Sequence, residues 1–137
     1  MKLVGFNFNK ISIEKFSNKS EKINAKMNIE IKEILKIKEN VIKSKEDLLA
    51  IEFVYNIDYS PEFAKIEFTG TLLLSIDPKE AKEILKEWEK KKTPKEFRMA
   101  VYNIILKKAN VKALSLEDEI GLPLHIQLPF FKKEEEV

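Results

Sequence analysis

The chain has 137 residues, the length of one domain, with no cysteine, one histidine (His125) and three glycines. This composition excludes disulfides, a cysteine nucleophile, thiolate or two-histidine metal sites and glycine-rich phosphate loops, so we expect a non-enzymatic protein without metal or cofactor. The 25 basic and 23 acidic residues nearly balance at a net charge of +2, and Arg98 is the only arginine, which disfavours sequence-specific recognition of nucleic acid.

Two strands are predicted at the start of the chain. Apolar residues alternate with polar ones through residues 3–16, and their parity changes at Asn9 and Lys10, which predicts a β-bulge there. Residues 23–31 then carry apolar side chains at five consecutive odd positions, which predicts a strand with one dry and one wet face. Residues 34–37 extend this strand through another bulge or form a short helical turn, and we favour the strand.

A β-hairpin is predicted next. Apolar residues occupy odd positions through residues 49–59 and even positions through residues 66–76. Ser60, Pro61 and Glu62 between them have the composition of a turn, so the two strands should pair antiparallel. Four strands therefore precede the rest of the chain.

Two helices are predicted after the strands. Asp77 and Pro78 resemble a helix start, with a short helix to about Lys92, and Thr93 begins a second helix that ends near Glu119. Residues 122–131 contain two prolines and are expected to be extended. Residues 132–137 form a charged tail, which leaves residues 1–131 as a single domain.

The second helix is apolar on two sides of a helical wheel. One four-stranded sheet can cover only one side, so we expect another subunit to cover the second. Alternatively, a monomer could cover it with its own first helix and residues 122–131. One side carries Phe97, Ala100, Val101, Ile104, Ile105 and Val111. The predicted oligomer interface on the other side comprises Met99, Tyr102, Leu106, Ala109, Ala113 and Leu116.

The order of the elements and three stretches of sequence resemble the SecB-type protein-export chaperones. Residues 6–14, Phe-Asn-Phe-Asn-Lys-Ile-Ser-Ile-Glu, are similar to the first strand of that family, and Phe97, Ala100 and Ile104 match the apolar frame of its long helix. After Gly121, residues 122–131 read Leu-Pro-Leu-His-Ile-Gln-Leu-Pro-Phe-Phe, similar to the family's closing Gly-x-Phe-Pro-x-Leu-x-Leu-x-Pro-x-x-Phe.

The resemblance implies an α+β fold in which a four-stranded antiparallel sheet is followed by a short and a long helix. It implies a homotetramer, built as a dimer of dimers, that holds unfolded or pre-export polypeptides in hydrophobic grooves without ATP. Service to a single partner such as an antitoxin is the alternative, and a SecA-type motor as partner stays open. A lysine-rich nucleic-acid-binding module and a small-molecule pocket are the competing functions from other classes.

Client binding requires apolar side chains that the subunit itself does not cover. Phe53 and Tyr55 have an alternative role in the core, and Trp88 could cap the core at the end of its helix. Phe130 and Phe131 should point to opposite sides of an extended segment, so at least one of them should be poorly buried. The candidate client-binding residues are Phe16, Met27, Phe53, Tyr55, Trp88, Leu124, Phe130 and Phe131.

Other polar residues predict no chemistry. His125 is expected to be a surface or partly packed histidine, and Glu117, Asp118 and Glu119 a solvated helix face. The chain shows no signal peptide and no 18-residue apolar stretch, which indicates a cytoplasmic protein. The excess of lysine, glutamate and isoleucine resembles heat-adapted proteomes.

Overall fold

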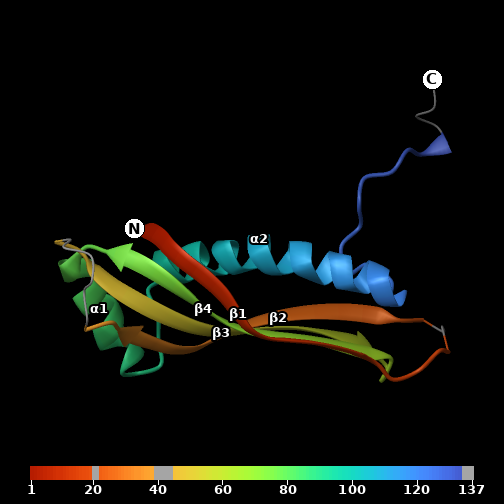
Figure 1. Ribbon diagram of the computed structural model, residues 1–137, viewed down its shortest axis with the longest axis horizontal. Helices are drawn as coiled ribbons and strands as arrows, with labels where there is room; N and C mark the ends of the chain where they lie inside the picture. Colours follow the sequence, from red (N-terminus) through yellow and green to blue (C-terminus); the bar gives the residue numbers. More distant parts are fainter. Residues whose placement is uncertain (20–21, 39–44, 134–137) are drawn as a thin grey trace.

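The computed structural model describes residues 1–19, 22–38 and 45–133. Within these residues the strands precede the helices, and the strands form one antiparallel sheet in the order β1-β4-β3-β2. Helix α2 lies along one face of the sheet, and α1 lies at one end (Figure 1). The predicted α+β arrangement is confirmed. The elements are β1 (Lys2–Lys15), β2 (Asn24–Lys36), β3 (Asp47–Ser60), β4 (Ala64–Ile76), α1 (Pro78–Trp88) and α2 (Lys95–Ile120).

Both predicted strand irregularities are present. The register of β1 against β4 shifts between Phe8 and Lys10, where the parity of the apolar residues changes. The register of β2 against β3 shifts between Ile31 and Glu33, and the strand continues beyond it without a helical turn. Because a one-residue shift reverses the side-chain alternation, Ile31 and Ile34 are both buried despite their opposite parity. A further shift after Leu3 was not predicted.

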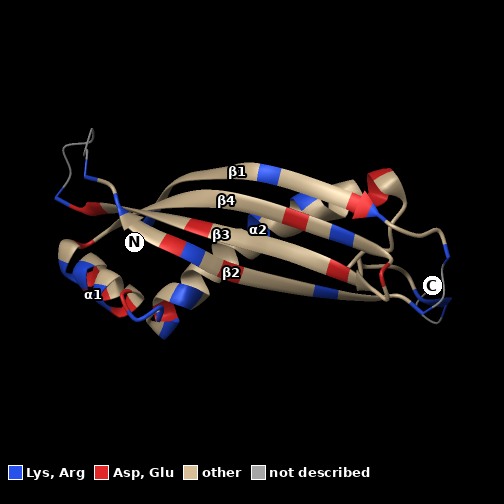
Figure 2. Ribbon diagram, turned by 90° about the horizontal axis from the view of Figure 1, so that it is seen from below, with Lys and Arg blue, Asp and Glu red and all other residues tan. Residues whose placement is uncertain are grey.

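The core lies between the sheet and α2. Central strands β3 and β4 supply most of it, and each large side chain buried there stabilises the fold by about 1.5–3 kcal/mol. The opposite face of the sheet carries charges of both signs (Figure 2). Lys10 and Glu67 form an ion pair of 2.7 Å there, and this hydrogen bond lowers the pKa of the Glu67 carboxyl. The large buried side chains are Leu49, Ile51, Phe53, Tyr55, Ile57 and Tyr59 on β3, and Ile66, Phe68, Leu72, Leu74 and Ile76 on β4.

On β4, the Phe53 ring occupies the space that a side chain at Gly70 would need. A Cβ atom there would lie 2.6 Å from the Phe53 ring and 2.6 Å from the Asn7 carbonyl oxygen. Gly70→Ala should therefore lower the free energy of unfolding by about 1–3 kcal/mol, measured by urea denaturation. Gly5→Ala is the matched control, because its Cβ would meet Leu73 at 3.4 Å, close to ordinary contact. Equal stability of the two variants would contradict this packing.

The buried stripe of α2 differs from the helical wheel. On a straight wheel Phe97 and Ala113 lie about 160° apart, yet both are buried against the sheet. The stripe advances by four residues at a time, so it winds around the helix, as a twisted sheet requires. Ala109 and Ala113 are fully covered within the subunit, so their assignment to an outer face was wrong. The buried series is Phe97, Val101, Ile105, Ala109, Ala113 and Glu117.

The helix ends follow the predicted signals with two differences. Helix α2 begins at Lys95 with Pro94 at its N-cap, so Thr93 does not begin it as predicted. Pro78 begins α1, and Gly121 ends α2 in the left-handed conformation that glycine tolerates. Helix α1 ends at Trp88 and not near Lys92, because the chain turns through Lys91, whose φ is 56°. Most of the predicted tail at residues 132–137 lies outside the described residues.

Candidate functional site

A groove of about 880 Å³ opens at the end of the sheet where β1 ends and β3 turns into β4. We call this the distal groove, and Phe16 and Phe63 are its aromatic residues. The Phe16 amide donates a hydrogen bond of 2.8 Å to the Phe63 carbonyl, which continues the β1–β4 ladder beyond Lys15. Phe63 is buried, whereas Phe16 is 53% exposed. The groove is lined by Phe16, Ser17, Lys19, Ile23, Pro61, Glu62 and Phe63.

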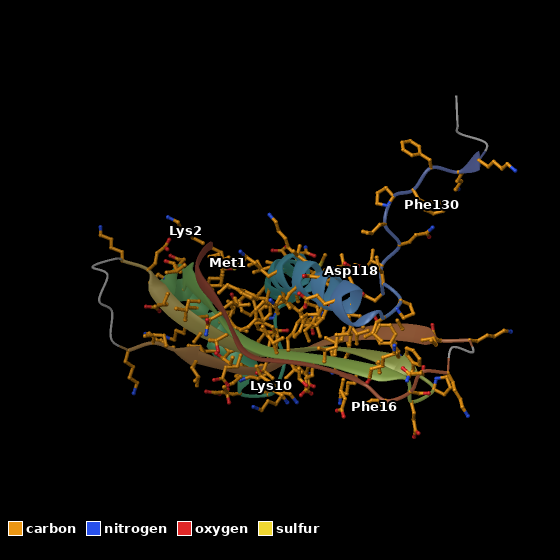
Figure 3. All side chains as sticks on the ribbon, turned by 45° about the vertical axis from the view of Figure 1, so that its right-hand side comes forward. Met1, Lys2, Lys10, Phe16, Asp118 and Phe130 are labelled. Carbon is orange, nitrogen blue, oxygen red and sulfur yellow. The ribbon has the colours of Figure 1, made fainter. Side chains whose placement is uncertain are left out.

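Residues 122–133, which we call the C-terminal segment, leave the body at the same end of the molecule (Figures 1 and 3). Leu122 is buried beside the helix end, but the segment then becomes exposed. Phe130 is 58% exposed and Phe131 is 87% exposed, so both rings are poorly covered by their own subunit. The exposed apolar residues of the segment are Leu124, Ile126, Leu128, Phe130 and Phe131.

The C-terminal segment is fixed to the body by an ion pair. The Glu117 side chain is completely buried, and the His125 side chain is 5% exposed. The His125 backbone N–H donates to Glu117 Oε1 at 2.8 Å, and His125 Nδ1 lies 2.7 Å from Glu117 Oε2. Nδ1 therefore carries a proton in this arrangement. A carboxylate buried at this depth requires such a partner.

The other ring nitrogen of His125 also meets polar atoms. His125 Nε2 lies 3.2 Å from the Tyr55 hydroxyl and 3.2 Å from Asn110 Oδ1. The Tyr55 hydroxyl itself donates to Asn110 Oδ1 at 2.7 Å. Both neighbours of Nε2 are oxygen atoms that can accept a hydrogen bond from the ring.

Two tyrosines of β3 complete the attachment. The Tyr59 hydroxyl donates a hydrogen bond of 2.8 Å to the Pro123 carbonyl. Burial, and then the charge of Glu117, raise the pKa of both Tyr55 and Tyr59, so both hydroxyls remain protonated donors. The sheet, α2 and the C-terminal segment thus meet in one buried polar cluster, which we call the anchor cluster: Tyr55, Tyr59, Asn110, Glu117 and His125.

A second cavity, of about 630 Å³, lies beside Trp88. The indole N–H donates to Glu33 Oε1 at 2.8 Å, which lowers the pKa of the Glu33 carboxyl. Lys91 Nζ lies 4.7 Å from the centre of the Trp88 ring. The cavity is lined by Glu30, Ile31, Lys32, Glu87, Trp88, Lys91, Lys92, Thr93, Arg98 and Tyr102.

The structure separates the predicted client-binding residues into three groups. Phe53 and Tyr55 are buried in the core, so their assignment to an exposed groove was wrong; odd-numbered side chains of β3 face α2. Trp88 is half-buried, and Met27 is exposed on edge strand β2. The remaining residues are exposed, but they do not form one surface: Phe16 lies at the distal groove, whereas Phe130 stands away from the body on the α2 side (Figure 3). The exposed residues are Phe16, Leu124, Phe130 and Phe131.

Sequence reasoning missed the anchor cluster. Glu117 was expected on a solvated face but is completely buried, whereas Asp118 and Glu119 are exposed. His125 is covered more fully than a surface histidine and has an acidic partner eight residues before it. Counting on from Phe97 in steps of four reaches Glu117, so the four-residue period of the buried stripe could have identified it.

The elements and their order define a SecB-like α+β fold. The chain is similar to the Mycobacterium tuberculosis SecB-like chaperone Rv1957, whose structure is in complex with a ChAD peptide from the Rv1956 HigA1 antitoxin. The match has a TM-score of 0.53 and 10% sequence identity, and it covers 96% of this chain and 89% of that chain. The predicted SecB-type resemblance is thus confirmed at the level of the fold.

No family model matches the sequence, and neither does any curated protein. Among the described residues, no helix is both long and apolar enough to cross a membrane. The same part of the chain contains no group of three or more acidic, histidine or cysteine side chains placed to hold a metal ion.

Proposed function

We propose that this protein is an ATP-independent chaperone that holds unfolded polypeptides at its distal end. The observation that carries the proposal is the exposed apolar C-terminal segment, which leaves a SecB-like fold at the same end of the molecule as the distal groove. Unfolded chains share apolar side chains, so a surface of exposed aromatic and aliphatic groups can bind many of them. Binding to the unfolded state restrains folding by mass action and requires no chemical step.

A dedicated chaperone for one partner is the second candidate. It is favoured by the structural match, because Rv1957 is bound to a peptide from an antitoxin. The two functions use the same kind of surface and differ in breadth. We place either function in the cytoplasm, in a working domain of residues 1–131.

The charge pattern disfavours the nucleic-acid alternative. Lys10, Lys32 and Lys36 each form an ion pair with an acidic side chain. Figure 2 shows acidic and basic residues interspersed over the strands, without a continuous basic stripe. A nucleic-acid surface needs unpaired basic groups that can neutralise phosphates.

The proposal is tested by aggregation suppression with several chemically denatured proteins and by affinity measurements with the same clients. Promiscuous binding supports the general holdase, and binding to one partner alone supports the dedicated chaperone. RNA or DNA binding that weakens steeply with salt would support the nucleic-acid reading instead. Absence of binding to any unfolded chain overturns both chaperone functions.

We also propose that the subunit works in a homotetramer, as the SecB resemblance implies. Strand β1 is a 14-residue edge strand with Leu3, Val4 and Ile11 exposed, and such edges favour pairing with another chain. Met99 is exposed on α2, whereas Tyr102 and Leu116 are partly packed against the core. Met99 is therefore the best placed of the predicted interface residues.

Met99→Lys is expected to lower the mass of the assembly, because it places a charge within a proposed apolar contact. Sedimentation velocity measures this against a subunit of 16.0 kDa. Asn28→Lys on β2 is the control, since it adds the same charge at an exposed polar position. A wild-type particle of a single subunit at all concentrations would contradict the proposed tetramer.

A further inference from the structure

We infer that the buried Glu117–His125 pair is a positioning device, which holds the C-terminal segment in the orientation that binds clients. This inference rests on the proposed function and adds how that surface is held in place. The residues concerned do not themselves contact the client: the pair acts through the segment that begins at Leu122.

The point of attachment lies close to the exposed rings along the chain. His125 lies only five residues before Phe130, and both its backbone N–H and its ring bond to Glu117. The segment therefore leaves the body at a point fixed by two hydrogen bonds to one carboxylate. Beyond it, Leu128, Phe130 and Phe131 are exposed.

The anchor cluster also has a second and third attachment, but neither replaces the carboxylate. Tyr59 holds the Pro123 carbonyl, and Tyr55 and Asn110 face His125 Nε2. Without Glu117, the His125 backbone N–H and Nδ1 would both lose their partner in a buried place. The bound orientation of the segment would then give way to a wider range of orientations.

If the C-terminal segment is no longer held in one orientation, client binding should weaken because fewer molecules have the segment in the binding-competent orientation. If the binding-competent orientation falls to about one tenth of molecules, the apparent dissociation constant rises about tenfold, without loss of any client contact. The apolar residues of the segment would all still be present. A loss of affinity with every contact side chain still present is what distinguishes a positioning residue from a contact residue.

The chain contains no cysteine, so Gln127→Cys gives a single attachment point for a nitroxide spin label on the exposed part of the segment. In this labelled protein, Glu117→Ala should increase label mobility, measured by electron paramagnetic resonance, and weaken client binding about tenfold. Glu119→Ala, which removes a carboxylate from an exposed position two residues away, should change neither quantity.

Glu117→Gln guards against a variant that does not fold, since its amide oxygen can still accept the His125 backbone N–H. It should give intermediate mobility and intermediate affinity, and hydrogen exchange in β3 and β4 should stay at the wild-type level. Unchanged label mobility in Glu117→Ala overturns the inference whatever the client data show. Raised mobility with unchanged affinity also overturns it. Absence of client binding by the wild-type protein instead overturns the proposed function, and the label then still reports on the attachment.

Discussion

His125→Ala is expected to lower the free energy of unfolding by about 3–5 kcal/mol, because it removes the ring that hydrogen-bonds to the buried Glu117 carboxylate. Urea denaturation followed by circular dichroism measures the change. Gln127→Ala is the matched control, since Gln127 lies two residues further along the same segment and is exposed. A loss below about 1 kcal/mol for His125→Ala would show that the pair is not needed to compensate the buried charge.

The double variant Glu117→Leu with His125→Leu sharpens this prediction. Removing both side chains also removes the cost of burying the carboxylate, so the double variant should be more stable than His125→Ala alone. Equal or lower stability of the double variant would instead show that the unpartnered Glu117 carboxylate is not the source of the loss in His125→Ala.

Phe130→Asp combined with Phe131→Asp is expected to weaken client binding at least tenfold. Covering one large apolar side chain contributes about 1.5–3 kcal/mol, and the two rings are the most exposed aromatic pair of the segment. The free energy of unfolding should stay within about 0.5 kcal/mol of wild type, because neither ring is part of the core. Affinity for a denatured client and urea denaturation measure the two quantities.

Lys79→Gln combined with Lys82→Gln on α1 is the control for this pair, because it changes the net charge by the same two units at exposed positions outside the C-terminal segment. It should bind clients like the wild-type protein. If the aspartate pair unfolded the subunit, the two rings would belong to the core and not to the binding surface.

The strands were predictable because their apolar residues alternate with few exceptions. Residues 49–59 and 66–76 each keep one parity, and they become β3 and β4 with that parity buried. The breaks in parity near Asn9 and after Ile31 locate real shifts of register. A pattern of period two reports directly on which side of a sheet each residue faces.

Helix α2 was predictable in extent but not in its faces. A straight wheel assumes that the covering surface does not turn, whereas this sheet twists and the buried stripe winds with it. Ala109 and Ala113 were misplaced for that reason. The same error placed Glu117 on a solvated face. Its buried carboxylate is hydrogen-bonded to His125, which the chain brings back beside α2 after the helix ends at Gly121.

The candidate site was predictable only beyond the last helix, where the side chains no longer belong to a regular element that packs on the core. Phe130 and Phe131 stand beyond the last helix, and their adjacency alone implies that they cannot both turn inward. Phe53 and Tyr55 could not be separated from groove residues by type, since aromatic side chains serve cores and binding surfaces alike. Their strand parity was the more reliable guide.

The prolines of the C-terminal segment lower its tendency to aggregate while it is exposed. An extended run of leucine, isoleucine and phenylalanine would ordinarily be a template for cross-β stacking between copies of the protein. Pro129, between Leu128 and Phe130, has no backbone N–H to donate, so the run cannot become an interior strand of a growing fibril. In the proposed function, the segment would offer its side chains to a client while its backbone resists polymerisation.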